Sequence, residues 1–222
     1  MPKVRNGSRL DRAAIAAAGL RLLDEAGLDG LTMRAVAAAL DVQAPALYWH
    51  IRNKQELLDA MAERLFVAVA DGVRAPAEGV DWMQWSADVV RRLRRELLRH
   101  RDGARVLAGT DVSHPAVHGV IELTLHTLTA AGFGTRQAAR AFPTLLHYTI
   151  GFTIEEQARV GEAYPENPYI PERIAQSIDA TRFPLTAATI GDMFDPDTDA
   201  AFDEGLQLIL TGMAALLPGQ RR

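Results

Sequence analysis

The sequence predicts an all-α protein with an N-terminal helix-turn-helix head of three helices, followed by a larger helical domain. Nearly every segment repeats apolar residues at three- and four-residue spacing, and none shows the alternation of a half-buried strand. Residues 31–58 hold two short helical patterns joined by a tight polar turn. Of the 222 residues, 48% are hydrophobic and 23% are charged, which is typical of a folded protein with a core.

The head begins with a predicted helix over residues 11–26, which carries an apolar stripe along one face. Gly27 follows as the predicted C-terminal cap, because glycine adopts the left-handed backbone conformation there at low cost. A compact second helix is predicted over residues 32–40. Thr32 is its expected N-cap, since a threonine hydroxyl can accept a hydrogen bond from a free backbone N–H of the first turn.

A turn at residues 41–43 leads to a third, short helix. Pro45 suits the first turn of this helix, where a missing N–H costs nothing, and the helix is expected to end near Ile51. Asn53 is then the predicted N-cap of a fourth helix over residues 54–70.

Helical patterns continue through the rest of the chain. Pro143 falls inside one of the long patterns, where it would kink the helix or shift its start. The predicted elements are a connector at 71–80, helices at 82–99, 103–108, 115–131, 135–161 and 198–217, and a proline-rich loop at 163–184 with a helical turn at 172–177.

The third helix carries unusual side chains for so short an element. Tyr48, Trp49 and His50 follow one another, and the cations Arg52 and Lys54 come directly after them. Aromatic rings with polar atoms and positively charged side chains are unfavourable in a hydrophobic core. They suit a helix that enters a DNA major groove beside phosphates. Many helical hairpins share the bare pattern, so these residues alone leave a packed hairpin equally open.

The charge distribution gives this interpretation modest support. The chain has a net charge of −4, which is unusual for a DNA-binding protein. Residues 1–58, however, hold eight Lys/Arg against six Asp/Glu, and the remainder holds sixteen against twenty-two. DNA affinity depends on the local face rather than on the overall charge.

Several function classes lack their sequence signals. The chain has no cysteine, which excludes disulfides and thiolate chemistry, and it has no G-x-S-x-G, P-loop, G-x-G-x-x-G or HExxH motif. Its N-terminus does not resemble a signal peptide, and no run of 18 apolar residues could cross a membrane. We therefore expect a cytoplasmic protein that is not an enzyme, has no cofactor and does not enter a membrane.

Longer segments carry a family resemblance. The run GLTMRAVAAALDVQAPALYWHIRNKQELLDAM, and above all LYWHIRNKQELL within it, resembles the DNA-binding head of the tetracycline-repressor (TetR) family. HRDGARVLAGT and HYTIGFTIEEQ resemble ligand-domain segments of the tetracycline repressors themselves.

This resemblance implies a ligand-responsive transcriptional regulator, most simply a repressor. Such a protein binds a palindromic operator in double-stranded DNA as a homodimer, and a small hydrophobic or drug-like effector releases it. The implied domains are a DNA-binding head at 1–58, with residues 32–50 as the helix-turn-helix core, and a ligand-binding and dimerisation domain at 59–222. The helices at 135–161 and 198–217 would form a four-helix bundle across the two-fold axis.

The resemblance also assigns the DNA contacts. Alanine at position 44 departs from the family pattern, because tetracycline repressors carry a base-reading glutamine there. Alanine can touch only a thymine methyl group, so we expect a different operator. The implied DNA-binding residues are Thr32, Arg34, Gln43, Ala44, Pro45, Tyr48, Trp49, His50 and Lys54.

The matching ligand pocket is more apolar than that of the tetracycline repressors. Leu107 stands where they carry a histidine that coordinates magnesium, so we expect no metal. His147 and Glu155 match residues that reach the metal through water; we interpret them instead as a buried, hydrogen-bonded pair. For each pocket residue, simple core packing is the alternative. The expected ligand-binding residues are Trp82, Trp85, Val89, Leu93, Leu107, Thr110, Leu123, Thr124, His147 and Phe152.

Two further patterns have ordinary explanations. A stripe of His114, His118, Glu122 and His126 could in principle share a metal, but its mixed surroundings indicate a solvated helix face. The arginines at 91, 92, 94 and 95 are predicted to form the outer face of an amphipathic helix.

Two other functions stay open from the residues alone. A helical enzyme could use His147 and Glu155 as acid and base. A binding protein could keep this fold and lose its operator, as the alanine at position 44 would allow.

Overall fold

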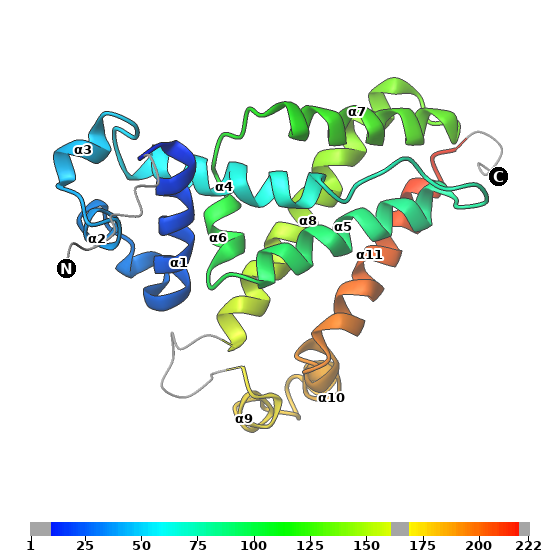
Figure 1. Cartoon of the computed structure of the whole chain (residues 1–222). Helices are drawn as coiled ribbons and strands as arrows, with labels where there is room; N and C mark the ends of the chain where they lie inside the picture. The colour runs from blue at the N-terminus through cyan, green and yellow to red at the C-terminus, as the bar shows by residue number, and fades with distance from the viewer. Residues whose placement is uncertain (1–9, 161–168, 218–222) are drawn as a thin grey trace.

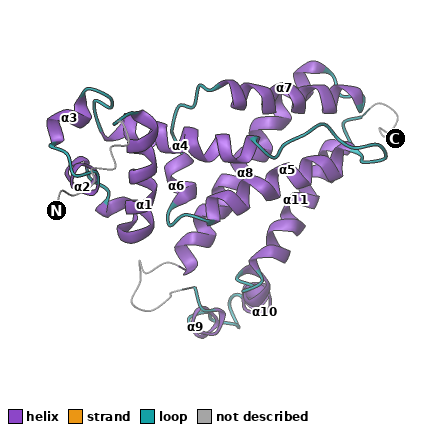
Figure 2. Ribbon diagram, viewed as in Figure 1, coloured by secondary structure: helices purple, strands orange, loops and turns teal. Residues whose placement is uncertain are grey.

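The computed structural model describes residues 10–160 and 169–217, and every regular element in these two stretches is an α-helix (Figure 2). A small group of helices forms one end of the molecule, and a long helix leads from it into the larger body (Figure 1). The predicted all-α fold is therefore confirmed.

The head consists of three helices, and side chains cap the starts of the first two. Asp11 accepts a hydrogen bond from the Ala14 N–H at 2.8 Å, and Thr32 Oγ1 accepts one from the Ala35 N–H at 3.1 Å. The predicted cap at Thr32 is thus confirmed. The helices are α1 (Arg12–Gly30), α2 (Met33–Ala39) and α3 (Ala44–Tyr48).

Two helix ends differ from the prediction. Gly27 has the predicted positive φ, 68°, but a further helical turn follows it, so that α1 extends to Gly30. The third helix ends at Tyr48 rather than near Ile51. After Tyr48 the chain closes a tighter turn, in which the His50 N–H donates to the Leu47 carbonyl three residues earlier, at 2.9 Å.

Helix α4 (Lys54–Ala70) joins the head to the body. Asn53 caps it as predicted, and its Oδ1 accepts a hydrogen bond from the Glu56 N–H at 2.9 Å. The apolar face of α4 packs first against α1 and then against α5, α6 and α7. One continuous core therefore runs through head and body, and the expected domain border at residue 58 falls within α4.

The body surrounds one long helix, α8, which contacts α5, α6, α7 and α11. A second core lies between α8, α5 and α11, where Phe202, Leu206 and Leu210 are almost fully buried. The body helices are α5 (Trp82–Leu98), α6 (Gly103–Leu107), α7 (Pro115–Ala130), α8 (Thr135–Val160), α9 (Pro171–Gln176), α10 (Pro184–Met193) and α11 (Thr198–Ala214).

The structure of the proline-rich region was predicted least well from the sequence. Its predicted helical turn corresponds to α9, and part of the predicted loop, 163–168, lies outside the described residues. The helix α10 was not predicted. It buries only Ile190, so its sequence lacks the apolar stripe that identifies a helix packed on a core.

The predicted outer face of arginines on α5 is wrong at Arg94, which is only 6% exposed. Its Nη2 and Nε atoms donate to the two carboxylate oxygens of Glu156 on α8, at 2.6 and 2.9 Å, and its Nη1 donates to Asp199 on α11 at 2.6 Å. Burial alone would lower the pKa of Arg94, but the hydrogen bonds to Glu156 and Asp199 outweigh it and raise that pKa. Arg94 therefore ties three helices together.

Candidate functional site

At one end of the head, aromatic side chains are exposed to solvent instead of packing in the core. Leu47 is fully buried and anchors α3, whereas Tyr48 is 48% exposed and Trp49 is 89% exposed. His50 is also exposed. An exposed cluster of large rings on one helix end marks an interaction surface rather than a core face.

The remaining predicted DNA-binding residues lie at the same end of the molecule, on α2, α3 and the start of α4 (Figure 1). Thr32 uses its hydroxyl oxygen to cap α2 and keeps its O–H free to donate to another group. Lys54 Nζ donates to the Leu28 carbonyl at 3.1 Å, which holds the ammonium group near the surface. Arg34, Gln43 and Pro45 are exposed, and Ala44 is half-buried.

A small cavity of about 40 Å³ lies among residues of α4, α5, α7 and α8. Four expected ligand residues line it: Trp85, Val89, Leu93 and Thr124. Its walls are otherwise apolar, apart from Ser86, which sequence reasoning missed because a single serine on an amphipathic helix gives no distinctive signal.

A larger, more open cavity of about 550 Å³ adjoins the first. The expected residues Leu107, Thr110 and His147 line it, and the hydroxyl of Thr110 donates to the Leu107 carbonyl at 2.8 Å. The two cavities share four wall residues, all of them apolar and drawn from α4, α7 and α8: Phe66, Val117, Phe142 and Leu146.

Three expected ligand residues do not line these cavities. Trp82 packs edge-on against Phe133 at 4.9 Å, and Phe152 packs against Phe202 of α11 at 5.2 Å. Leu123 borders a separate hollow between α4 and α7. For Phe152 the reason is its position around the helix. Phe152 lies on the side of α8 that faces α11, whereas Leu146 and Ile150 lie on the side that faces the cavities.

The interpretation of His147 and Glu155 as a buried pair is wrong. Both side chains are exposed. They stand eight residues apart on α8, about 12 Å along its axis, which is too far for a hydrogen bond. Among the described residues, no three His, Cys, Asp or Glu side chains are grouped so that they could hold a metal ion.

The histidine stripe on α7 lies on a solvated face, as predicted. His126 Nε2 lies 3.1 Å from Glu122 Oε1, and both side chains are at least 70% exposed. His114 instead caps α7 and accepts a hydrogen bond from the Ala116 N–H at 3.1 Å.

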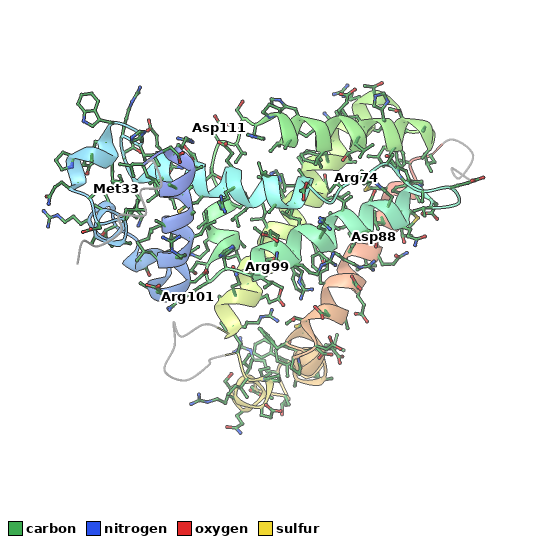
Figure 3. All side chains as sticks on the ribbon, viewed as in Figure 1. Met33, Arg74, Asp88, Arg99, Arg101 and Asp111 are labelled. Carbon is green, nitrogen blue, oxygen red and sulfur yellow. The ribbon has the colours of Figure 1, made fainter. Side chains whose placement is uncertain are left out.

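Sequence reasoning also missed the junction between the body and α1. The Asp24 carboxylate accepts a hydrogen bond from the Arg101 N–H at 3.1 Å, and Asp102 Oδ2 accepts one from the Leu28 N–H at 2.8 Å. Figure 3 shows Arg101 beside the end of α1. These contacts lie between residues more than 70 positions apart, so local sequence could not reveal them.

Gln157 of α8 fixes the other side of this junction. Its side-chain amide donates to the carbonyls of Leu97 and His100, at 3.2 and 2.8 Å, and accepts a hydrogen bond from the Ala104 N–H at 3.1 Å. A chain of hydrogen bonds thus runs from α8, beside the larger cavity, through the α5–α6 turn to α1. These contacts join α8 to α1 of the head through the α5–α6 turn.

No helix in residues 10–160 and 169–217 has both the length and the apolar composition needed to cross a membrane.

Comparisons with known proteins identify the fold and both of its parts. Residues 15–61 match "Bacterial regulatory proteins, tetR family", and residues 75–217 match "Tetracyclin repressor-like, C-terminal domain". The class A tetracycline repressor protein from transposon 1721 of Escherichia coli is 38% identical over 207 residues, covering 93% of this chain and 92% of that protein.

Two solved structures from Streptomyces coelicolor agree closely with this one. A possible TetR family transcriptional regulator of strain A3(2) superimposes with a TM-score of 0.84 at 42% identity, covering 93% of this chain and all of the other. The TetR family protein ActR, in complex with actinorhodin, gives a TM-score of 0.83 at 28% identity, covering 96% and 99%. The chain therefore belongs to the tetracycline-repressor family of DNA-binding transcriptional regulators, whose members are not enzymes.

Proposed function

We propose that this protein is a cytoplasmic repressor that binds a palindromic operator as a homodimer and leaves it when an uncharged, hydrophobic effector binds. The observation that carries the proposal is the pair of adjoining cavities behind α4. Phe66 of α4 lines both of them, and the same helix begins at Lys54 in the head. An effector in either cavity therefore contacts the helix that also positions the head.

The effector must also prefer the released conformation. A molecule that binds both conformations equally shifts no equilibrium, however tightly it binds. Half-sites of a palindrome lie about one helical turn of DNA apart, or a multiple of it, so a small change in the distance between the two heads loses contacts at both.

The outer surface of α11 supports the homodimer. This helix buries Phe202 and Leu206 inside the subunit but leaves Leu208 77% exposed, and Leu216, just after the helix ends, is 45% exposed. A second subunit would cover these side chains in an isologous interface built from α8 and α11.

We assign DNA contacts to residues 1–58 and ligand binding and dimerisation to residues 59–222, with α4 shared between them. In this assignment Arg34 reads a guanine edge, while Thr32 and Lys54 hold phosphates. The remaining contacts come from the start and end of α3: Gln43, Ala44, Pro45, Tyr48, Trp49 and His50.

Binding-site selection from random duplexes tests the DNA-binding part of the proposal. We expect a palindrome that differs from the tetracycline operator, because Ala44 cannot hydrogen-bond a base. A gel shift should then show binding to the selected site and to DNA adjoining the protein's own gene, with steep salt dependence. Recovery of the tetracycline operator would contradict the role given to Ala44, and a protein that selects no sequence would contradict the repressor function.

We assign the effector site to the two cavities, with Trp85, Val89, Leu93 and Thr124 in the smaller one and Leu107, Thr110 and His147 in the larger. The residues do not fit a magnesium chelate. Leu107 offers no ligand atom, and His147 and Glu155 are exposed and eight residues apart.

We expect release from DNA to need no divalent metal. Effectors of any class that dissociate the protein from its operator should act equally in magnesium and in excess EDTA, because the cavity walls offer shape and apolar contact rather than oxygen ligands. The measurement is a fluorescence-anisotropy titration of the operator complex in both buffers. An effector that works only with magnesium would overturn this expectation.

A further inference from the structure

Helix α1 is interrupted at Gly27, shortly before its end. Gly27 has φ 68° and ψ 178°, far from helical values, so the backbone N–H of Leu28 points away from the carbonyl that it would meet in a continuous helix. A partly buried backbone N–H is unfavourable without a partner. The body supplies that partner, because Asp102 Oδ2 accepts a hydrogen bond from the Leu28 N–H at 2.8 Å.

Asp102 lies in the turn between α5 and α6, and its own position is fixed. Its backbone adopts the left-handed conformation, with φ 56°, which aspartate, asparagine and glycine tolerate better than other residues. Its other carboxylate oxygen, Oδ1, accepts a hydrogen bond from Arg105 Nη1 at 3.2 Å, and the side chain is only 20% exposed. The carboxylate therefore presents one oxygen to the head from a defined place.

The carbonyl of the same Leu28 contacts the DNA-binding surface. Lys54 Nζ donates to this carbonyl at 3.1 Å. An ammonium group has three N–H donors, and within the described residues Lys54 uses one of them, so two are left for a phosphate. A lysine side chain without an anchor is flexible and loses conformational entropy when a partner fixes it. Leu28 thus binds the body through its N–H and a DNA-binding lysine through its carbonyl.

We propose that Asp102 is a positioning residue for operator binding: it holds Leu28, whose carbonyl in turn holds the Lys54 ammonium group where an operator phosphate arrives. The inference rests on the proposed function, in which Lys54 contacts a phosphate, and it gives a residue of the body a part in DNA affinity. Because the ammonium group is placed before DNA binds, each half-site loses less side-chain entropy on association.

Two substitutions at position 102 separate the hydrogen bond from the charge and from the backbone conformation. Asp102→Asn and Asp102→Gly both remove the negative charge, and both new residues tolerate a positive φ. Asparagine keeps an oxygen that can accept from the Leu28 N–H, whereas glycine has no acceptor. We expect Asp102→Gly to weaken operator binding about tenfold, the usual effect of ordering one long side chain in each of two half-sites. Asp102→Asn should stay within about threefold of wild type.

The salt dependence and a second substitution show whether Asp102 acts through Lys54. Since Lys54 still meets its phosphate in the complex, Asp102→Gly should leave the slope of log K against log salt unchanged. In a Lys54→Ala background, Asp102→Gly should change the affinity by less than about twofold, because no ammonium group is left to position.

Trp49→Ala provides the matched background. Trp49 is 89% exposed at the end of α3 and lies outside this chain of hydrogen bonds. Adding Asp102→Gly to it should therefore cost about tenfold again, as in the wild-type background. Fluorescence anisotropy with the selected operator measures all affinities, and a thermal melt checks that each full-length variant folds. If Asp102→Gly does not fold, Asp102→Ala, which also lacks an acceptor, takes its place.

Equal losses in the wild-type and Lys54→Ala backgrounds would overturn the inference, because Asp102 would then act on the head as a whole. Wild-type affinity in folded Asp102→Gly would overturn it too, as would an equal loss in Asp102→Asn. The proposed function fails by a different result, a wild-type protein that selects no operator. The two failures are distinguishable, because each comparison at position 102 starts from a wild-type protein that binds its operator.

Discussion

Trp49→Ala should weaken operator binding about a hundredfold without destabilising the protein. The ring is 89% exposed, so its removal costs little buried surface, and exposed substitutions usually change stability by less than about 0.5 kcal/mol. We assign the indole N–H of Trp49 to a DNA phosphate. A hydrogen bond to a charged phosphate is worth about 1.5 kcal/mol, and a dimer makes the contact in both half-sites. The combined loss of about 3 kcal/mol corresponds to the stated factor. Fluorescence anisotropy with the selected operator and a thermal melt measure both quantities.

The salt dependence separates this contact from a charge contact. Trp49 is neutral, so its loss should leave the slope of log K against log salt unchanged. Lys54→Ala, as the charged comparison, should reduce that slope by about two in the dimer, because one phosphate contact is lost in each half-site. Arg95→Ala, an exposed cation on α5, should change neither affinity nor slope. Wild-type affinity in folded Trp49→Ala would remove Trp49 from the DNA surface.

Local signals in the sequence predicted the head well because each depends on a few neighbouring residues. Thr32 and Asn53 cap their helices as expected, since an N-cap involves only the next three residues. The positive φ of Gly27 follows from the same kind of local chemistry. The position of the helix-turn-helix could therefore be predicted without any knowledge of the body.

The body was harder to predict because the outcome depends on which helix covers which face. Periodicity places Phe152 on an apolar face of α8, but only the packing of α11 shows that this face belongs to a core and not to a cavity. Arg94 has the sequence environment of an exposed residue, and its partner Glu156 lies 62 positions away. A family match shows which residues of two proteins occupy equivalent positions. It does not show what each side chain contacts, because those contacts depend on the neighbouring helices.

Arg94→Met should lower the free energy of unfolding by about 3–5 kcal/mol, the usual cost of removing one partner from a buried ion pair. The substitution leaves the Glu156 carboxylate, 6% exposed, without its two charge-assisted hydrogen bonds. It also removes the guanidinium group from the Phe202 ring, 4.9 Å away. Asp199 adds less, since its side chain is 85% exposed. For a chain of this size the melting temperature should fall by roughly 10 °C.

Two companion variants show whether the buried pair is the cause. Arg95→Met makes the same chemical change at the next, exposed position of α5 and should leave stability within about 0.5 kcal/mol of wild type. Arg94→Met combined with Glu156→Leu should recover most of the loss, because no unpaired carboxylate stays buried. Equal melting temperatures for Arg94→Met and wild type would show that the pair does not stabilise the fold. Arg94 joins α5 to α8 and α11, and we assign these last two helices to the dimer interface. Loss of Arg94 should therefore also weaken the dimer. In sedimentation experiments the single variant should be monomeric at protein concentrations where wild type is still a dimer, whereas the double variant should dimerise almost as wild type does.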